Sequence, residues 1–198
     1  MDRLKEMYLP AVRGWGAQLT EEKDPYQVGH AQRVADYATK LAREVGVGGW
    51  DLTYLRIGAF IHDLGNMAVP AEVLAKTDVL SQDEREIMKV HTIMGDSMAK
   101  QLDFPAEVRP IVRSHHEQWA GTGYPDRLVG EEIPLGARII AVCDAYDAMI
   151  SDRAYRRALD REHPGDRGPD AARGSGDERV TSLQACLHQT SMARSAGA

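Results

Sequence analysis

Histidines recur along this chain on the apolar sides of successive predicted helices, and this pattern constrains the fold more than any other feature. Apolar residues three and four apart predict a helix over residues 26–45, where His30 lies one turn before Val34 on the apolar face. His91 lies on the apolar stripe of a later helix that follows Ser81. Helices that turn both apolar and imidazole side chains inward predict a bundle with histidines in its interior.

The other segments also predict helices. Asp51 is placed to cap a second helix that ends at His62 and Asp63, and Ser81 with Glu84 forms a capping box for the third. The sequence shows no alternating strand pattern of useful length. The predicted fold is therefore all-α, with two further helices that run from Asp103 through His115 to Trp119 and, after Pro134, from Leu135 to Ser151.

Composition limits the function. A chain of 198 residues that is 43% hydrophobic suits one domain with a core. A net charge of -6 argues against a partner that is a nucleic-acid polymer. The two cysteines give no disulfide framework, and the sequence shows neither a secretion signal nor a membrane-spanning stretch, so we expect a cytoplasmic protein without a membrane partner.

Five of the seven histidines fall on inner helix faces or helix ends, together with two aspartates. Each buried polar group without a partner costs about 1–3 kcal/mol, and metal ions would supply the partners. A mixed histidine and carboxylate set suits Fe, Mn, Zn or related ions. Seven candidate ligands exceed one tetrahedral shell, so we predict two divalent ions, with Fe or Mn favoured, held by His30, His62, Asp63, His91, His115, His116 and Asp144.

The order of these residues, with the motifs HHEQWAGTGYP and DAYDAMISDRAYR, resembles the HD-GYP domains of the HD superfamily of metal-dependent phosphohydrolases. The resemblance covers roughly residues 10–157. It implies an HD-type helical bundle with a metal centre inside, and hydrolysis of cyclic di-GMP. One ion would be surrounded by His30, His62, Asp63 and Asp144, the other by His91, His115 and His116, with Asp63 as the bridge.

The same resemblance implies roles for further residues. A metal-bridged hydroxide would attack phosphorus to give pGpG, GMP or both, with Asp63 and Asp147 as the catalytic residues and Asp147 orienting a ligand or the water. Family members with a third ion often carry a glutamate one turn before the first histidine, where this chain has Tyr26, so two ions are expected. The predicted substrate contacts are Arg153, Arg156, Gly123, Tyr124, Pro125 and Asn66, the last standing where the family commonly has lysine.

Several alternatives stay open. The Gly-Tyr-Pro loop alone could be a simple turn, and arginines near a helix C-terminus are also good caps. The substrate could be another nucleotide, such as cyclic GMP-AMP or an alarmone. A degenerate module that binds metal, ligand or a signalling partner without turnover is a rival of a different class.

The predicted organisation has three parts. Residues 1–25 form a leading helix, which could dock a signalling protein or a second copy of the chain. Residues 26–157 form the HD-GYP catalytic domain. Residues 158–198 are rich in Gly, Pro, Asp and Arg and depart from the family, so we expect a disordered tail that arose by a frameshift or truncation near Ala158.

Overall fold

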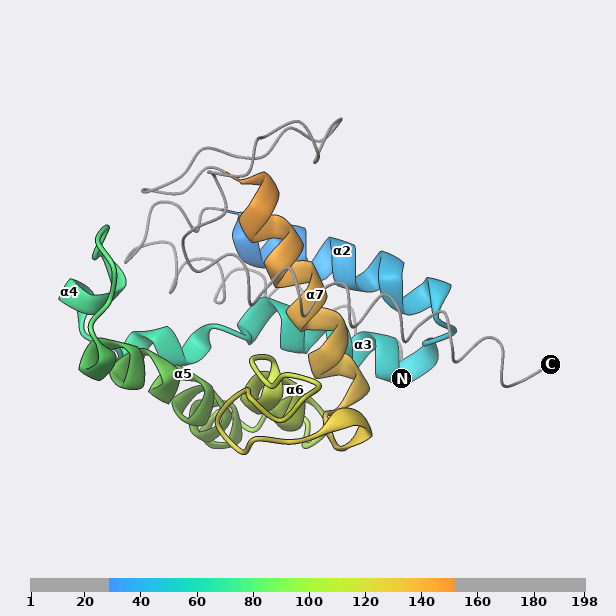
Figure 1. Ribbon diagram of the computed structural model, residues 1–198. Helices are drawn as coiled ribbons and strands as arrows, with labels where there is room; N and C mark the ends of the chain where they lie inside the picture. Colours follow the sequence, from blue (N-terminus) through green and yellow to red (C-terminus); the bar gives the residue numbers. More distant parts are fainter. Residues whose placement is uncertain (1–28, 152–198) are drawn as a thin grey trace, which may run out of the picture.

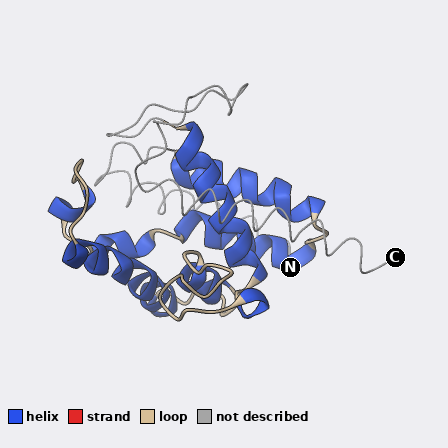
Figure 2. Cartoon of the chain, in the orientation of Figure 1, coloured by secondary structure: helices blue, strands red, loops and turns tan. Residues whose placement is uncertain are grey.

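The computed structural model describes residues 29–151, which form helices and loops without a strand (Figures 1 and 2). The all-α prediction is therefore confirmed for this part of the chain. The leading helix and the tail lie outside the described residues. The elements, in chain order, are α2 (His30–Glu44), α3 (Gly49–Ile61), the 3-10 helix η2 (Leu64–Ala68), α4 (Ala71–Leu74), α5 (Gln82–Gln101), α6 (Val108–Ser114), the 3-10 helix η3 (Gly130–Glu132) and α7 (Leu135–Ile150).

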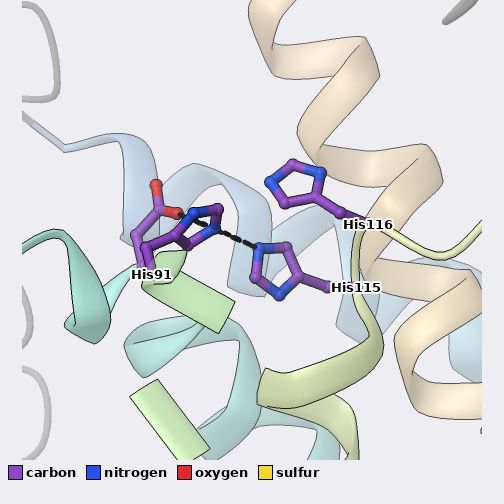
Figure 3. A group of neighbouring side chains, drawn as sticks. His91, His115 and His116 are labelled. Atoms are coloured by element: carbon purple, nitrogen blue, oxygen red, sulfur yellow. Dashed lines mark hydrogen bonds and ion pairs between the residues drawn. The ribbon is translucent and has the colours of Figure 1, made fainter. Parts of the chain in front are cut away.

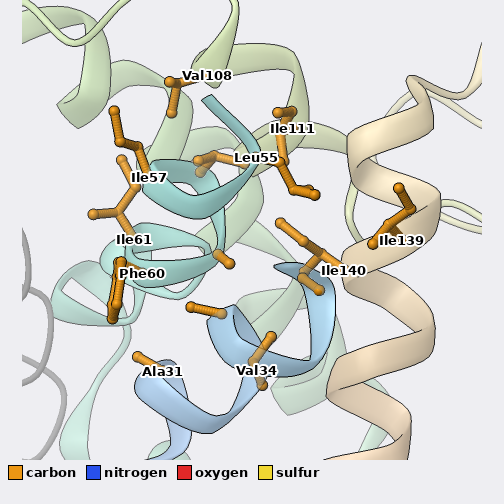
Figure 4. Packing of buried hydrophobic residues seen from close by; sticks show 14 of the residues in the cluster. Ala31, Val34, Leu55, Ile57, Phe60, Ile61, Val108, Ile111, Ile139 and Ile140 are labelled. Carbon is orange, nitrogen blue, oxygen red and sulfur yellow. The ribbon is translucent and has the colours of Figure 1, made fainter. Parts of the chain in front are cut away.

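The core lies where α2, α3, α6 and α7 meet (Figure 4). Helices α2 and α3 run side by side, and α7 packs against α2 while crossing both in the view of Figure 1. Leu55 of α3, Val112 of α6 and Ile140 of α7 are almost completely buried in this core. Full burial of one such side chain contributes about 1.5–3 kcal/mol, so the core fixes the helices that carry the histidines.

Two of the predicted helix starts can be compared with the structure. Ser81 caps α5 as predicted, because its hydroxyl accepts from the Glu84 backbone while the Glu84 carboxylate accepts from the Ser81 backbone. The prediction for α3 was wrong, since the helix begins after Gly48 and Asp51 lies inside its first turn. A carboxylate there still complements the positive end of the helix dipole, so Asp51 favours the same helix from a different position.

The fourth predicted helix is shorter than expected. It ends at Ser114, with His115 as its C-cap, and does not continue to Trp119. The backbone N–H of Glu117 donates to the Ser114 carbonyl at 3.0 Å, so the last turn tightens before the chain leaves the helix. The adjacent pair His115 and His116 therefore lies at a helix end, where consecutive side chains need not diverge by the helical angle.

A close backbone approach joins η2 to α5. A Cβ atom at Gly65 would overlap the carbonyl oxygen of His91 and lie 2.6 Å from the backbone nitrogen of Gly95. Only glycine permits this approach, which brings the segment after Asp63 against the helix that carries His91. Among residues 29–151, no helix combines the length and the hydropathy needed to cross a bilayer.

Candidate metal centre

Two groups of side chains meet inside the bundle with their potential ligand atoms within 4.8 Å of one another. One group comes from α2, the end of α3 and α7, whereas the other comes from the start of η2, α5 and the end of α6. Figure 3 shows three imidazoles of the second group turned toward one another. The structure thus brings together all seven predicted ligands, as His30, His62 and Asp144 in the first group and Asp63, His91, His115 and His116 in the second.

The backbone orients three of the histidines. The Nδ1 atoms of His62, His91 and His115 lie 2.7–2.8 Å from the carbonyl oxygens of the residues three positions earlier. A carbonyl oxygen can only accept, so each Nδ1 carries the hydrogen and Nε2 is the ring nitrogen left to bind a cation. Such bonds are the usual way in which a metal-binding histidine is held in one tautomer.

The Nε2 atoms of four histidines face each other in pairs. His30 Nε2 lies 3.4 Å from His62 Nε2, and His91 Nε2 lies 3.3 Å from His115 Nε2. Two lone pairs at this distance in a buried site repel unless a cation or a proton lies between them. The donor set and its geometry therefore fit a divalent ion in each group.

Asp63 contacts both groups. Its Oδ2 lies 3.5 Å from His62 Nε2, while its Oδ1 lies 3.7 Å from His91 Nε2 and 3.9 Å from His115 Nε2. Burial raises the pKa of Asp63, but the surrounding histidines outweigh burial and hold it far below its usual range. The carboxylate is thus ionised and presents one oxygen to each group, as a bridging ligand would.

His30 is held by a side chain instead of a backbone carbonyl. Its Nδ1 donates to Asp147 Oδ2 at 2.8 Å, and Arg33 donates to both Asp147 oxygens at 2.6 and 2.9 Å. Burial raises the pKa of Asp147, yet the bonds from His30 and Arg33 bring it down to about 2. Asp147 therefore lies where it can orient a ligand. Arg33 was not predicted, although its position one turn after His30 places the two side chains on neighbouring parts of α2.

The loop after α6 brings Tyr124 to the second group. Its ring stacks on His116, with centroids 5.0 Å apart and an interplanar angle of 27°. A Cβ at Gly123 would lie 2.5 Å from Glu117 Cα, so glycine lets the loop fold tightly against the residues that follow the histidine pair. Pro125 follows Tyr124 through a cis peptide bond.

The remaining predicted substrate contacts are placed only in part. Asn66 lies in η2, and its buried Oδ1 has no hydrogen-bond partner among the described residues. Arg153 and Arg156 lie outside the described residues, as does Tyr26. Sequence reasoning also gave no role to Glu117, although it directly follows the histidine pair. Its carboxylate is buried and accepts from three backbone N–H groups.

The metal-free protein is expected to lose stability on mild acidification because of His115. Burial, with the neighbouring imidazoles of His116, His62 and His91, lowers the pKa of His115 well below its ordinary value of 6.5. His115 therefore binds a proton near pH 6.5 in the unfolded chain but not in the folded chain. As a result, unfolding becomes more favourable as pH falls. Between pH 7 and 5.5 we expect the free energy of unfolding to drop about 1 kcal/mol further in the wild type than in His115→Gln.

Urea unfolding of the chelator-treated chains at both pH values measures this difference. The pKa of His30 is raised, because Asp147 and the other nearby carboxylates outweigh burial. The stabilisation that protonated His30 gives the folded chain is present below pH 6.5 and is lost as pH rises. It therefore changes stability in the opposite direction to His115, and it does so in both the wild type and the variant. Equal pH dependence of wild type and variant would contradict the assignment to His115.

Known proteins have sequences similar to that of this chain. The sequence profile of the HD domain matches residues 16–163. Over 144 residues the chain is 37% identical to the cyclic di-GMP phosphodiesterase response regulator RpfG of Xanthomonas campestris, covering 72% of this chain and 38% of that protein. It is 32% identical over 156 residues to 3'3'-cGAMP-specific phosphodiesterase 3 of Vibrio cholerae, covering 79% of this chain and 34% of that protein.

A solved structure has the same fold. The HDG"Y"P protein from Bdellovibrio bacteriovorus superposes with a TM-score of 0.54 at 26% identity, over 62% of this chain and 40% of that chain. The chain spans about a third of the length of these two curated relatives, 34% and 38%. On the matched profile and the helical fold around the paired His and Asp groups, this chain belongs to the HD domain family and resembles its HD-GYP type.

Proposed function

We propose that this chain is a metal-dependent phosphodiesterase that hydrolyses cyclic di-GMP to pGpG, GMP or both. The observation that carries the proposal is Asp63, whose two oxygens face two separate histidine groups. Paired ions a few ångströms apart are the arrangement that phosphate-ester hydrolases use to hold both the attacking and the leaving oxygen. The relatives named as cyclic di-GMP and cyclic GMP-AMP phosphodiesterases support the substrate class.

The seven predicted ligands would hold the two ions, and we propose Fe or Mn for both. When bound, the ions would supply positive charge for the phosphoryl oxygens and lower the pKa of water near the phosphorus. The imidazoles of His62, His91 and His115 would bind the ions through Nε2, because their Nδ1 atoms already donate to backbone carbonyls.

The chain's other residues would orient and bind. Asp147 would hold the His30 ring at a fixed angle through the 2.8 Å hydrogen bond, and Arg33 would hold Asp147 in turn. Tyr124 would form a wall of the substrate pocket beside His116. We further propose that Arg153 and Arg156 bind the substrate phosphates, a task that suits the guanidinium fork.

The proposed activity is tested with purified chain loaded anaerobically with Fe(II) or Mn(II). Cyclic di-GMP and 3'3'-cGAMP are incubated separately, and chromatography follows pGpG, GMP and the linear mixed dinucleotide over time. We expect cyclic di-GMP to be hydrolysed and a His115→Ala variant to be inactive. Faster hydrolysis of 3'3'-cGAMP would reassign the substrate, a result that the similarity to the Vibrio cholerae relative makes worth measuring.

The rival of a different class is a module that binds without turnover. If neither dinucleotide is cleaved by a sample that holds two ions per chain, one in each ligand group, the enzyme proposal fails. Equilibrium dialysis with cyclic di-GMP then separates a binding module, which retains the dinucleotide, from a chain with another ligand.

A further inference from the structure

The carboxylate of Glu117 has no role in the ligand groups, although it directly follows His115 and His116. Its side chain is buried, and its residue is only 5% exposed. Oε1 accepts from the backbone N–H groups of Asp126 at 2.7 Å and Arg127 at 3.0 Å, while Oε2 accepts from that of Leu128 at 3.1 Å. Three consecutive backbone donors thus converge on one carboxylate.

All three donors lie in the loop that runs from Gln118 to Val129. A buried carboxylate is costly without donors, and these three N–H groups supply them. Arg127 adopts the left-handed region at φ 57, which is unfavourable for a non-glycine residue and needs such support. Arg113 also donates to both oxygens of Asp126 at 2.7 Å, but this pair is partly exposed.

The loop that Glu117 contacts also contacts His116, in two ways. The Tyr124 backbone N–H donates to the His116 carbonyl at 3.3 Å, and the Tyr124 ring stacks on the imidazole. The His116 ring in turn lies 4.2 Å from that of His115 and 5.1 Å from that of His91, between centroids. The position of the loop therefore bears directly on where this imidazole can lie in the second group.

We propose that Glu117 is a positioning residue for His116. Its carboxylate binds the backbone N–H groups of residues 126–128 and so fixes the position of the loop. The fixed loop holds the Tyr124 ring against the His116 imidazole. This stack keeps the His116 ring turned toward His91 and His115. Glu117 itself touches no ion and no substrate. The proposal concerns the protein before substrate binds, so it can succeed or fail independently of the proposed hydrolysis.

Glu117→Gln tests the first link. The amide has the size of the carboxylate but one oxygen instead of two, so at least one of the loop N–H groups meets a donor. The matched control is Glu132→Gln, because Glu132 also accepts from a backbone N–H of this loop, that of Val129 at 2.9 Å, but at an exposed site. NMR of ring-labelled histidine in the metal-free full chain reports the His116 signal, whose position depends on the ring current of Tyr124.

We expect Glu117→Gln to move the His116 signal toward its position in Tyr124→Leu, with the His30 signal unchanged and Glu132→Gln like the wild type. Affinity for Mn(II), measured by competition with a chelator, should fall about 10–100-fold in Glu117→Gln, as for other groups that orient a ligand. An unmoved His116 signal with an affinity within about twofold of the wild type would overturn the proposal.

The double variant tests whether Glu117 acts through Tyr124. If it does, Glu117→Gln with Tyr124→Leu binds Mn(II) no more weakly than the weaker single variant. Losses that multiply would show that the two residues act separately and would overturn the proposed route. Should Glu117→Gln fail to fold, Tyr124→Leu decides alone, because normal Mn(II) affinity there leaves the stack without a role.

Discussion

Replacing Asp63 by asparagine should lower the rate of the proposed cyclic di-GMP hydrolysis by more than about 100-fold, since even residues that only orient a metal ligand cost 10–100-fold. The amide keeps the shape but loses the charge, and its nitrogen cannot bind a cation. The loss reaches both ligand groups, because Oδ2 of Asp63 lies 3.5 Å from His62 while Oδ1 lies 3.7 Å from His91. Metal content after desalting, measured by mass spectrometry, should fall in parallel with the rate.

The matched control is Asp36→Asn. Asp36 is an aspartate on α2, but it is exposed and accepts a hydrogen bond from Gln32 at 2.9 Å. This variant should keep the metal content and rate of the wild type. An Asp63→Asn chain that retains both ions and full activity would show that the two groups do not depend on a shared carboxylate.

Gly65→Ala should destabilise the chain by about 3 kcal/mol or more, at the upper end of what overpacking costs. The new methyl group would overlap the His91 carbonyl oxygen, and both clashing partners are backbone of α5. A flexible side chain could move aside, whereas a helix backbone can yield only if η2 separates from α5. That separation would also draw Asp63 away from His91, so metal affinity should fall with stability.

Gly48→Ala provides the comparison. Gly48 has φ -145, which any residue adopts, and a Cβ there would meet no atom within 4 Å. Its cost should stay below about 1 kcal/mol, as for most surface changes. Urea unfolding of both variants measures the difference, and a Gly65→Ala chain as stable as Gly48→Ala would mean that the approach of η2 to α5 is looser than described.

Much of the fold could be predicted from the sequence, because the helices of this chain carry local signals. The apolar stripe after Ser81 and its capping box are short-range features, and α5 forms where they indicate. Helix ends were less predictable. The apolar spacing continues past Ser114 to Trp119, but the helix ends at Ser114 and the following residues belong to a loop. In this loop Glu117 accepts a hydrogen bond from Leu128, and only the folded chain brings these two residues together.

The candidate site, too, could be predicted only in part. Histidines on inner helix faces could be identified one by one, and the structure places them in two groups. Asp147 was expected to orient a ligand or the water, but its partner Arg33 could not be foreseen, because the two residues are 114 residues apart and meet only when α2 packs on α7. Arginine at a helix surface and glutamate beside a loop are common enough that sequence alone gives no reason to single them out.

The hydrogen bonds from Nδ1 to backbone carbonyls have an evolutionary consequence. His62, His91 and His115 are oriented by the carbonyls of Ala59, Met88 and Val112, and a carbonyl stays in place whatever side chain its residue carries. The sequence around these ligands can therefore drift as long as the helical turn persists. The His30 ring depends on the Asp147 side chain and lacks this freedom, so the surroundings of His30 should tolerate fewer mutations than those of the other three histidines.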